Sequence, residues 1–117
     1  MIIRYLGKTK KIKVKKASIF GRISGLMFRP KTTENLLFEF RKKTRIKIHS
    51  FFVFFNFLAI WIDRKNKVIF WKIIGPFSPP FSPKKSFSKI IEVPLNKRNI
   101  GIINFFDGKK GLNISEA

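Results

Sequence analysis

Two neighbouring apolar stretches in the middle of the chain decide the fold. Residues 51–62 read FFVFFNFLAIWI, and after the polar turn DRKNK at 63–67 the chain returns with VIFWKII at 68–74. Phe, Val, Ile and Trp favour strands. A membrane-spanning helix needs about 20 apolar residues, whereas the first stretch is shorter and contains Asn56. We therefore expect one or two strands buried on both faces within 51–62, and a hairpin over 51–74.

The N-terminus also predicts a hairpin. An apolar stretch over 2–6 is followed by a possible turn at 7–9, and residues 11–15 then read KIKVK. On a strand, this alternation places Ile12 and Val14 on the core face and the three lysines on the opposite face.

The rest of the chain predicts shorter elements. The spacing of Ile19, Ile23 and either Leu26 or Met27 is helical, and Pro30 disfavours a continuation of that helix. The predicted elements are a short helix over 18–27, a strand over 36–40, an extended Pro-rich connection over 75–83, a strand over 88–93 stopped by Pro94, and a loop-rich tail over 96–117 with a turn at 107–108, a short strand over 112–114 and a loose end over 108–117.

Length and composition predict one domain that spans residues 1–117. Hydrophobic residues make up 44% of the sequence, which supplies enough apolar material for one core. Together with the strand pattern, this predicts a β-rich α+β fold. We expect a strongly bent antiparallel or mixed sheet, or a partial barrel, with one short helix on it.

The charge of the chain is extreme. Its 26 Lys and Arg residues stand against 6 Asp and Glu residues, which gives a formal net charge of +20. Counter-ions or a polyanionic partner relieve the repulsion within such a chain. A genome rich in A and T offers another explanation for the many Lys, Ile, Phe and Asn residues, although it explains the shortage of acids poorly. Both explanations stay open here, and the partner classes that the charge favours are nucleic acid and anionic lipid.

Two basic segments are the candidate sites for polyanion binding. Alternate side chains on a strand lie about 6.6 Å apart, which is comparable to the spacing of successive phosphates. Such contacts follow a nucleic-acid backbone and carry no sequence information. The candidate residues are Lys11, Lys13 and Lys15 in the first segment and Arg41, Lys42, Lys43, Arg45 and Lys47 in the second.

The sequence offers little for catalysis or metal binding. It contains one His and no Cys. His49 and Ser50 are neighbours, and neighbours along a strand point to opposite faces, so a Ser-His-Asp triad with Asp63 is not expected. Metal sites need three or four convergent ligands, and a phosphate-binding Gly-rich loop is missing. We therefore predict a protein that is not an enzyme and holds no metal and no cofactor.

The segment Gly25-Leu26-Met27-Phe28-Arg29 resembles the signature of an uncharacterised family, domain of unknown function 192, also called the UPF0127 group. The likeness extends over roughly residues 18–107 and includes Arg22, Leu36–Phe40, His49 with Phe52–Phe55, Ile60–Asp63 with Val68, Pro76-Phe77 and Ile90–Pro94. Residues 56–58 lack the Pro and Asp that are usual in the family, and only Asp107 remains of its Gly-Asp turn. The resemblance implies a small β-rich α+β fold and no established activity.

Three functional hypotheses follow. The first is a non-enzymatic accessory protein that binds the backbone of RNA or DNA through its basic strands. The second is a peripheral membrane protein that places Phe77 and Phe81 in the interface of an anionic bilayer. The third is a small-ligand pocket near Arg22, Arg29 and His49, at positions covered by the family resemblance. For Arg29, the alternative is a guanidinium that fastens a loop by bonding to strand carbonyls or to Glu39.

We expect a cytoplasmic location, because a secretory signal places its charges before a longer apolar run. The natural partner and the oligomeric state stay open.

Overall fold

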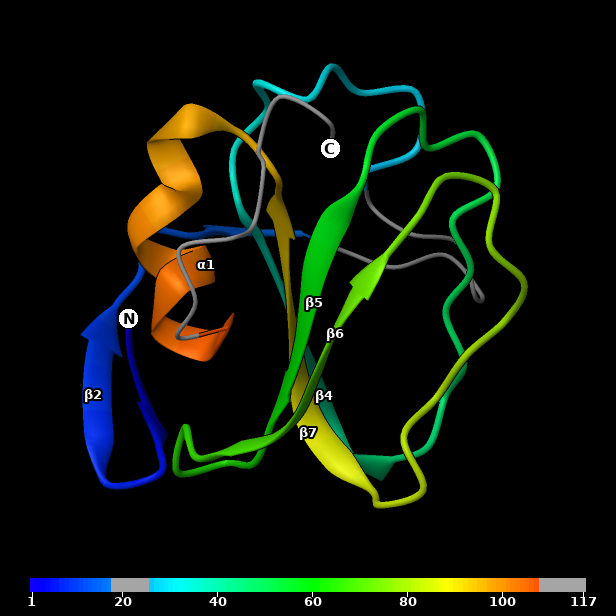
Figure 1. Ribbon diagram of the computed structural model, residues 1–117. Helices are drawn as coiled ribbons and strands as arrows, with labels where there is room; N and C mark the ends of the chain where they lie inside the picture. Colours follow the sequence, from blue (N-terminus) through cyan, green and yellow to red (C-terminus); the bar gives the residue numbers. More distant parts are fainter. Residues whose placement is uncertain (18–25, 108–117) are drawn as a thin grey trace.

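The computed structural model describes residues 1–17 and 26–107. Within these ranges the chain forms a two-stranded hairpin, a five-stranded sheet and a C-terminal helical segment (Figure 1). The elements are β1 (Ile2–Tyr5), β2 (Lys8–Lys11), β3 (Lys15–Lys16), β4 (Leu36–Thr44), β5 (Phe57–Ile62), β6 (Val68–Ile74), β7 (Phe87–Pro94), the 3-10 helix η1 (Lys97–Asn99) and α1 (Ile100–Asp107).

The five-stranded sheet has the order β3–β4–β7–β5–β6, with β7 at its centre. β3 and β4 are parallel, and the other neighbouring strands are antiparallel. Ile91 of β7 pairs with Leu37 of β4 on one side and with Ile60 of β5 on the other. The strands predicted over 36–40 and 88–93 are confirmed as parts of β4 and β7. The predicted fold class is also confirmed: the sheet is mixed and bent, and it is not closed into a barrel.

β5 is buried at every position, which explains the apolar sequence that predicted it. Leu58 and Ile60 belong to the core on one face, where the β1–β2 hairpin and α1 pack against the sheet. Ala59 and Trp61 belong to the core on the other face, which the loop between β4 and β5 covers. Two-sided burial of this strand is therefore as predicted.

The central hairpin is shorter than predicted, because β5 begins only at Phe57. A turn diverts the chain before β5 and is closed by a hydrogen bond from Val53 N to Ser50 O (3.0 Å). Val53 is buried in the core, whereas Phe52 and Phe54 are exposed. An apolar run can thus contain a loop, and composition alone does not show where the strand starts.

The N-terminal hairpin is confirmed, with Ile2 opposite Lys11. Its turn lies at Leu6-Gly7, one residue earlier than predicted, and the φ of Gly7 is +77°. The prediction that residues 11–15 form one strand is wrong. β2 ends at Lys11, and the chain then crosses to the large sheet, where Lys15 begins β3 beside β4.

The helical segment η1–α1 corrects the prediction of a loop-rich tail from residue 96. Asn96 caps η1, because its side chain accepts a hydrogen bond from Asn99 N over 3.1 Å. Three apolar residues of α1 are buried at helical spacing. The predicted helix over 18–27 lies outside the described residues except for its last two, which form part of a turn, and the predicted strand over 112–114 lies outside them entirely. None of the helices described here has the length and apolar character needed to cross a membrane.

Candidate anion-binding site

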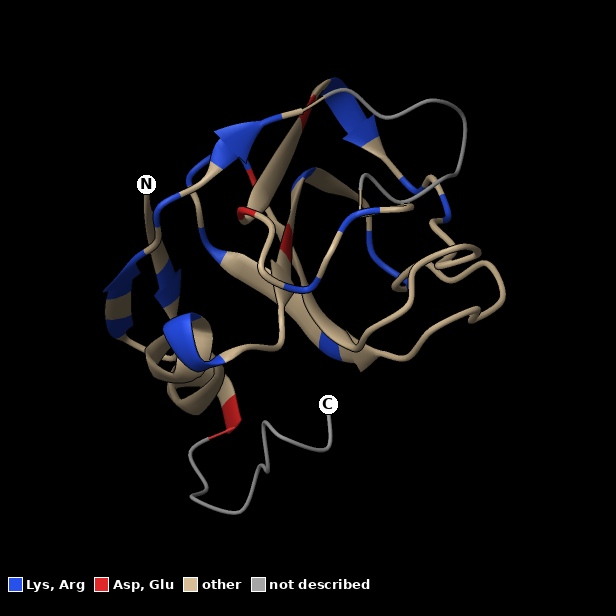
Figure 2. Ribbon diagram, turned by 90° about the horizontal axis from the view of Figure 1, so that it is seen from above, with Lys and Arg blue, Asp and Glu red and all other residues tan. Residues whose placement is uncertain are grey.

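The basic side chains have few acidic partners. Between two described residues there is one salt bridge, from Lys16 Nζ to Glu39 Oε1 (3.1 Å), and both side chains are substantially exposed. Exposed pairs of this kind contribute little to stability. Figure 2 shows Lys and Arg on several sides of the molecule, including the hairpin and the start of the helical segment, whereas Asp and Glu are sparse. The positive charge is therefore not neutralised within the described part of the fold.

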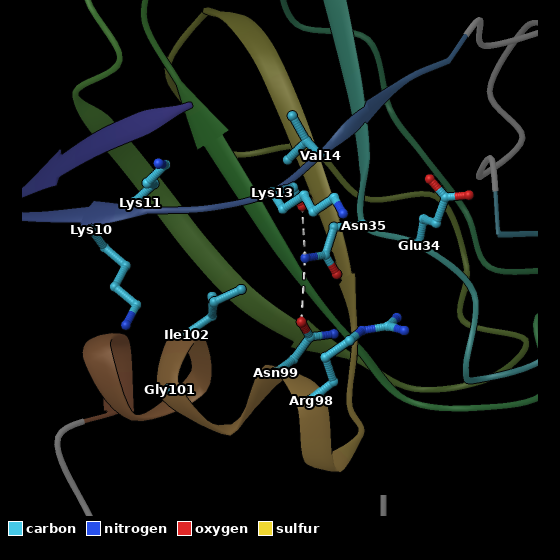
Figure 3. Close-up of a pocket in the computed structure, with 10 residues that line it drawn as sticks. All are labelled: Lys10, Lys11, Lys13, Val14, Glu34, Asn35, Arg98, Asn99, Gly101 and Ile102. Carbon is cyan, nitrogen blue, oxygen red and sulfur yellow. Dashed lines mark hydrogen bonds between the residues drawn. The ribbon is translucent and has the colours of Figure 1, made fainter.

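A cavity of about 420 Å³ lies between the β2–β3 region and the η1–α1 segment (Figure 3). Its walls carry the cationic side chains of Lys10, Lys11, Lys13 and Arg98 and the carboxylate of Glu34. Four positive charges and one negative charge leave a net of three positive charges around the cavity. In Figure 3, Lys10 and Lys11 lie on one side of the cavity and Arg98 and Glu34 on the other. The site therefore favours an anion.

Two of the three lysines predicted in the first basic segment line this cavity. Lys11 and Lys13 belong to its walls, whereas Lys15 does not. All three side chains are exposed, as predicted, and Ile12 between them is buried with 1% exposed. Val14 lines the cavity and packs against the core. The alternation of basic and apolar residues thus persists although the strand is interrupted.

Lys10 and Arg98 also line the cavity, although neither was among the binding residues predicted from the sequence. Arg98 Nη2 donates hydrogen bonds to the carbonyl oxygens of Thr32 (3.1 Å) and Thr33 (2.6 Å). These bonds fix the guanidinium while Nε and Nη1 remain as further donors. A Cβ added to Gly101 would lie 3.3 Å from Lys10 Nζ. The absence of a side chain at Gly101 therefore gives the ammonium of Lys10 room beside α1.

Two buried asparagines join the walls of the cavity. Asn35 Nδ2 donates to Lys13 O (3.1 Å) and to Asn99 Oδ1 (3.2 Å). Asn99 Nδ2 donates to Pro94 O (2.7 Å). Since a backbone carbonyl only accepts hydrogen bonds, both amide groups have a defined orientation. These hydrogen bonds connect the side of the cavity that carries Lys13 to the side that carries Arg98.

The second predicted basic segment lies at the other end of β4. All five basic side chains of residues 41–47 are exposed. Lys15 pairs with Leu36 at the start of β4, and the strand continues to Thr44, a length of roughly 27 Å for extended backbone. Arg64 Nη2 donates to Arg41 O, which brings another cation to this end. The two basic segments are therefore separate and do not form one continuous row.

The alternative pocket was predicted near Arg22, Arg29 and His49. Arg22 lies outside the described residues, so only Arg29 and His49 can be placed. Arg29 is exposed, and its Nη1 donates to Thr33 Oγ1 over 3.4 Å. His49 Nδ1 accepts a hydrogen bond from Phe51 N over 3.3 Å. Neither Arg29 nor His49 lines the cavity, and the hydrogen bonds of both are local.

Ser50 does not form a hydrogen bond with His49. Its Oγ donates to Gly75 O (2.6 Å) and accepts from Ser78 N (2.7 Å), so the hydroxyl connects two loops. Over residues 1–17 and 26–107, no three His, Cys, Asp or Glu side chains are grouped as metal ligands would be.

Comparison with known proteins places the chain in a family. No family model matches it. It is 32% identical over 112 residues to the UPF0127 protein TK1120 of Thermococcus kodakarensis, an alignment that covers 93% of this chain and 68% of that protein. The chain belongs to the UPF0127 family. The resemblance predicted from residues 25–29 and the segments after them is therefore confirmed.

Structural comparison of this UPF0127 protein supports the fold. It resembles the crystal structure of a protein of unknown function from Novosphingobium aromaticivorans, with a TM-score of 0.59 and 10% sequence identity, over 86% of this chain and 74% of the other. The descriptions of these two proteins state no activity. The comparisons therefore assign no function to this UPF0127 protein.

Proposed function

We propose that this UPF0127 protein is a non-enzymatic accessory protein that binds the phosphate backbone of nucleic acids. The observation that carries the proposal is the cavity lined by Lys10, Lys11, Lys13 and Arg98, where four cations stand against one carboxylate. Contacts from Lys and Arg to phosphates supply affinity that does not depend on sequence.

The cavity takes one phosphate group, and the exposed cations around it contact neighbouring phosphates. The guanidinium of Arg98 offers a planar set of donors to the phosphate oxygens, and the lysines act as point charges. The second basic segment starts at Arg41, five residues after the Leu36 that pairs with Lys15, or roughly 17 Å along β4. At about 6.6 Å between successive phosphates, roughly three phosphate-to-phosphate intervals of one strand separate the two segments.

Base stacking adds little in this proposal. Trp61 is fully buried, and Trp71 is half-buried with its Nε1 donating to Tyr5 Oη over 3.1 Å. Both tryptophans pack in or against the core, and the exposed ring of Phe77, the third candidate for stacking, does not line the cavity. Binding should therefore follow charge and chain length more than base identity.

The test compares two charge-neutralised double variants in a salt titration. Lys10→Gln/Lys13→Gln removes two cavity charges, and Lys84→Gln/Lys85→Gln removes two exposed charges outside the cavity. Fluorescence anisotropy with a generic single-stranded RNA and a generic DNA duplex gives the slope of log affinity against log salt. For the duplex, we expect the cavity variant to flatten this slope by about two, with the control slope close to wild type.

Three results would contradict the proposal. One is no binding to either polymer at low salt, and another is an equal change of slope in both double variants. The third is tight binding of inorganic phosphate or a mononucleotide that is lost in the cavity variant while neither polymer binds, which would indicate a small-ligand site instead.

A further inference from the structure

Four exposed phenylalanines form one cluster on the surface. Phe28, Phe52, Phe54 and Phe77 leave 66%, 48%, 62% and 47% of their surfaces exposed. The ring centroids of Phe28 and Phe52 are 5.2 Å apart, and those of Phe54 and Phe77 are 5.3 Å apart. Phe52 also meets Phe77 at 5.9 Å. We call these four residues the phenylalanine cluster.

The backbone at three of these residues is in the left-handed region. The φ values are +61° for Phe28, +64° for Phe52 and +54° for Phe77. Bulky residues seldom adopt this conformation, because Cβ crowds the backbone, and such strain gathers at functional positions. Since the strained residues leave about half or more of their surface exposed, burial of their rings in the core does not explain them.

Hydrogen bonds hold the loops of the cluster together. Phe28 N donates to Phe52 O, and Phe77 N donates to Ser50 O, each over 2.9 Å. Ser78 N donates to Ser50 Oγ over 2.7 Å. The rings are therefore presented by connected loops, not by independent flexible tips.

Phe81, which the sequence analysis grouped with Phe77, does not belong to this cluster. Its ring lies 5.5 Å from that of Trp61 and 5.9 Å from that of Phe70. Its backbone forms an isolated bridge with Ile48. Phe81 therefore docks on the sheet, and Phe77 alone of the two faces outward.

The cluster lies away from the anion-binding cavity. Figure 1 places the loops at 26–29, 50–56 and 75–78 on the side of the molecule opposite the β1–β2 hairpin and α1. At 150–250 Å² for a phenylalanine side chain, the exposed fractions amount to roughly 400 Å² of apolar surface. A contiguous patch of this size is in the range of the largest apolar patch of a typical monomer, which is often a functional surface.

We infer that the phenylalanine cluster docks into the interface of a bilayer that contains anionic lipid. Charge complementarity decides between possible occupants. A second copy of this chain would bring another net charge of +20 close to the first, which opposes association. A bilayer with anionic headgroups accepts the aromatic rings between its acyl chains and attracts the cations beside them.

Two cationic residues follow Phe28 of the phenylalanine cluster in the sequence. Arg29 follows Phe28 directly and is exposed, and Lys31 nearby is also exposed. Arg29 Nη1 donates to Thr33 Oγ1 over 3.4 Å, which holds the guanidinium near its loop. The cluster therefore combines apolar rings with adjacent positive charge, the pattern of interfacial binding segments.

The first experiment measures co-sedimentation with phosphatidylcholine vesicles, with and without about 30% phosphatidylserine. We expect wild type to bind the anionic vesicles at least about tenfold more tightly, and Phe54→Ser/Phe77→Ser to lose at least about tenfold of that affinity. Ile2→Ser/Leu6→Ser is the matched control, because it removes exposed apolar side chains from the hairpin. Its affinity for anionic vesicles should stay within about twofold of wild type.

The second experiment places a reporter in the cluster. Phe54→Trp adds emission to that of Trp61 and Trp71, and the difference spectrum against wild type should shift to shorter wavelength on anionic vesicles and be quenched by brominated acyl chains. Unchanged emission, or full vesicle binding by Phe54→Ser/Phe77→Ser, would overturn the inference and leave charge alone as the cause of vesicle binding.

Sedimentation velocity tests the other occupant, a second copy of the chain. A wild-type dimer that becomes a monomer in Phe54→Ser/Phe77→Ser would overturn the inference in favour of self-association. Because this variant leaves the cavity intact, it should retain nucleic-acid binding, whereas Lys10→Gln/Lys13→Gln should retain ring insertion.

Discussion

Asn35 Nδ2 donates a hydrogen bond to Asn99 Oδ1 over 3.2 Å, although the two residues lie 64 positions apart in the sequence. Both side chains are buried, with 7% and 2% exposed. The bond connects the residue before β4 to the last residue of η1. The same pair therefore determines both the stability of this corner of the fold and the distance between the two walls of the cavity.

Asn99→Ala should destabilise the protein. It removes the acceptor of Asn35 Nδ2 and the donor to Pro94 O. A buried polar group that loses its partner costs about 1–3 kcal/mol, so we expect the free energy of unfolding to fall by about 2–3 kcal/mol in urea denaturation. Asn104→Ala on the exposed side of α1 is the control and should change it by less than about 0.5 kcal/mol. Equal losses in the two variants would contradict the role given to Asn99.

Salt should stabilise this fold. The net charge is +20, and the pair Lys16–Glu39 is the one salt bridge between described residues, so screening relieves more repulsion than attraction. Raising NaCl from about 20 mM to about 500 mM should increase the free energy of unfolding by about 1 kcal/mol. Urea is the denaturant of choice here, because it adds no ions. A decrease with salt would show that attractive pairs dominate the folded state.

The strands β4, β5, β6 and β7 could be predicted because apolar residues are concentrated in their sequences, whereas the short exposed strand β3 could not. β5 is buried on both faces and is apolar throughout, and the turn that follows it is polar. The start of β5 could not be predicted, because Phe52 and Phe54 are as apolar as Phe57 but are exposed in a loop. α1 was missed because Gly101 and two phenylalanines lower its helix propensity. Asn96, which caps η1, was the residue in the sequence that could have indicated the start of this helical segment.

The cavity was predictable only in part. Alternation with Ile12 indicated that Lys11 and Lys13 face solvent, and this follows from local pattern alone. Arg98 comes from a distant segment, and its place opposite those lysines depends on hydrogen bonds to Thr32 and Thr33. Long-range contacts of this kind leave no periodic signal in a single sequence.

Ser50→Ala should loosen the loops that carry the phenylalanine cluster. Ser50 is fully buried, and its loss leaves Ser78 N without the acceptor that now lies at 2.7 Å. We expect the free energy of unfolding to fall by about 1–3 kcal/mol. Ser78→Ala is the matched comparison. It removes the bond from Ser78 Oγ to Gly75 O, but Gly75 O keeps its bond from Ser50 Oγ. The free energy of unfolding of this variant should therefore fall by less than about 1 kcal/mol. Urea denaturation measures both, and a larger loss for Ser78→Ala would reverse the assignment.

Phe52→Gly should be more stable than Phe52→Ala, the reverse of the usual order. The φ of Phe52 is +64°, a conformation in which a Cβ costs about 1–2 kcal/mol and glycine has no such cost. Both variants lose the same ring contacts, so their difference is the backbone strain of alanine minus the entropic cost of ordering glycine, and we expect about 0.5–1 kcal/mol in favour of glycine. Phe54 has no positive φ, so there Ala should be more stable than Gly by about 0.5–1 kcal/mol. Thermal and urea unfolding of the four variants measure both differences. If Ala were the more stable residue at both positions, the left-handed backbone at Phe52 would not be a property of the folded protein, and the argument that strain presents these rings would fail.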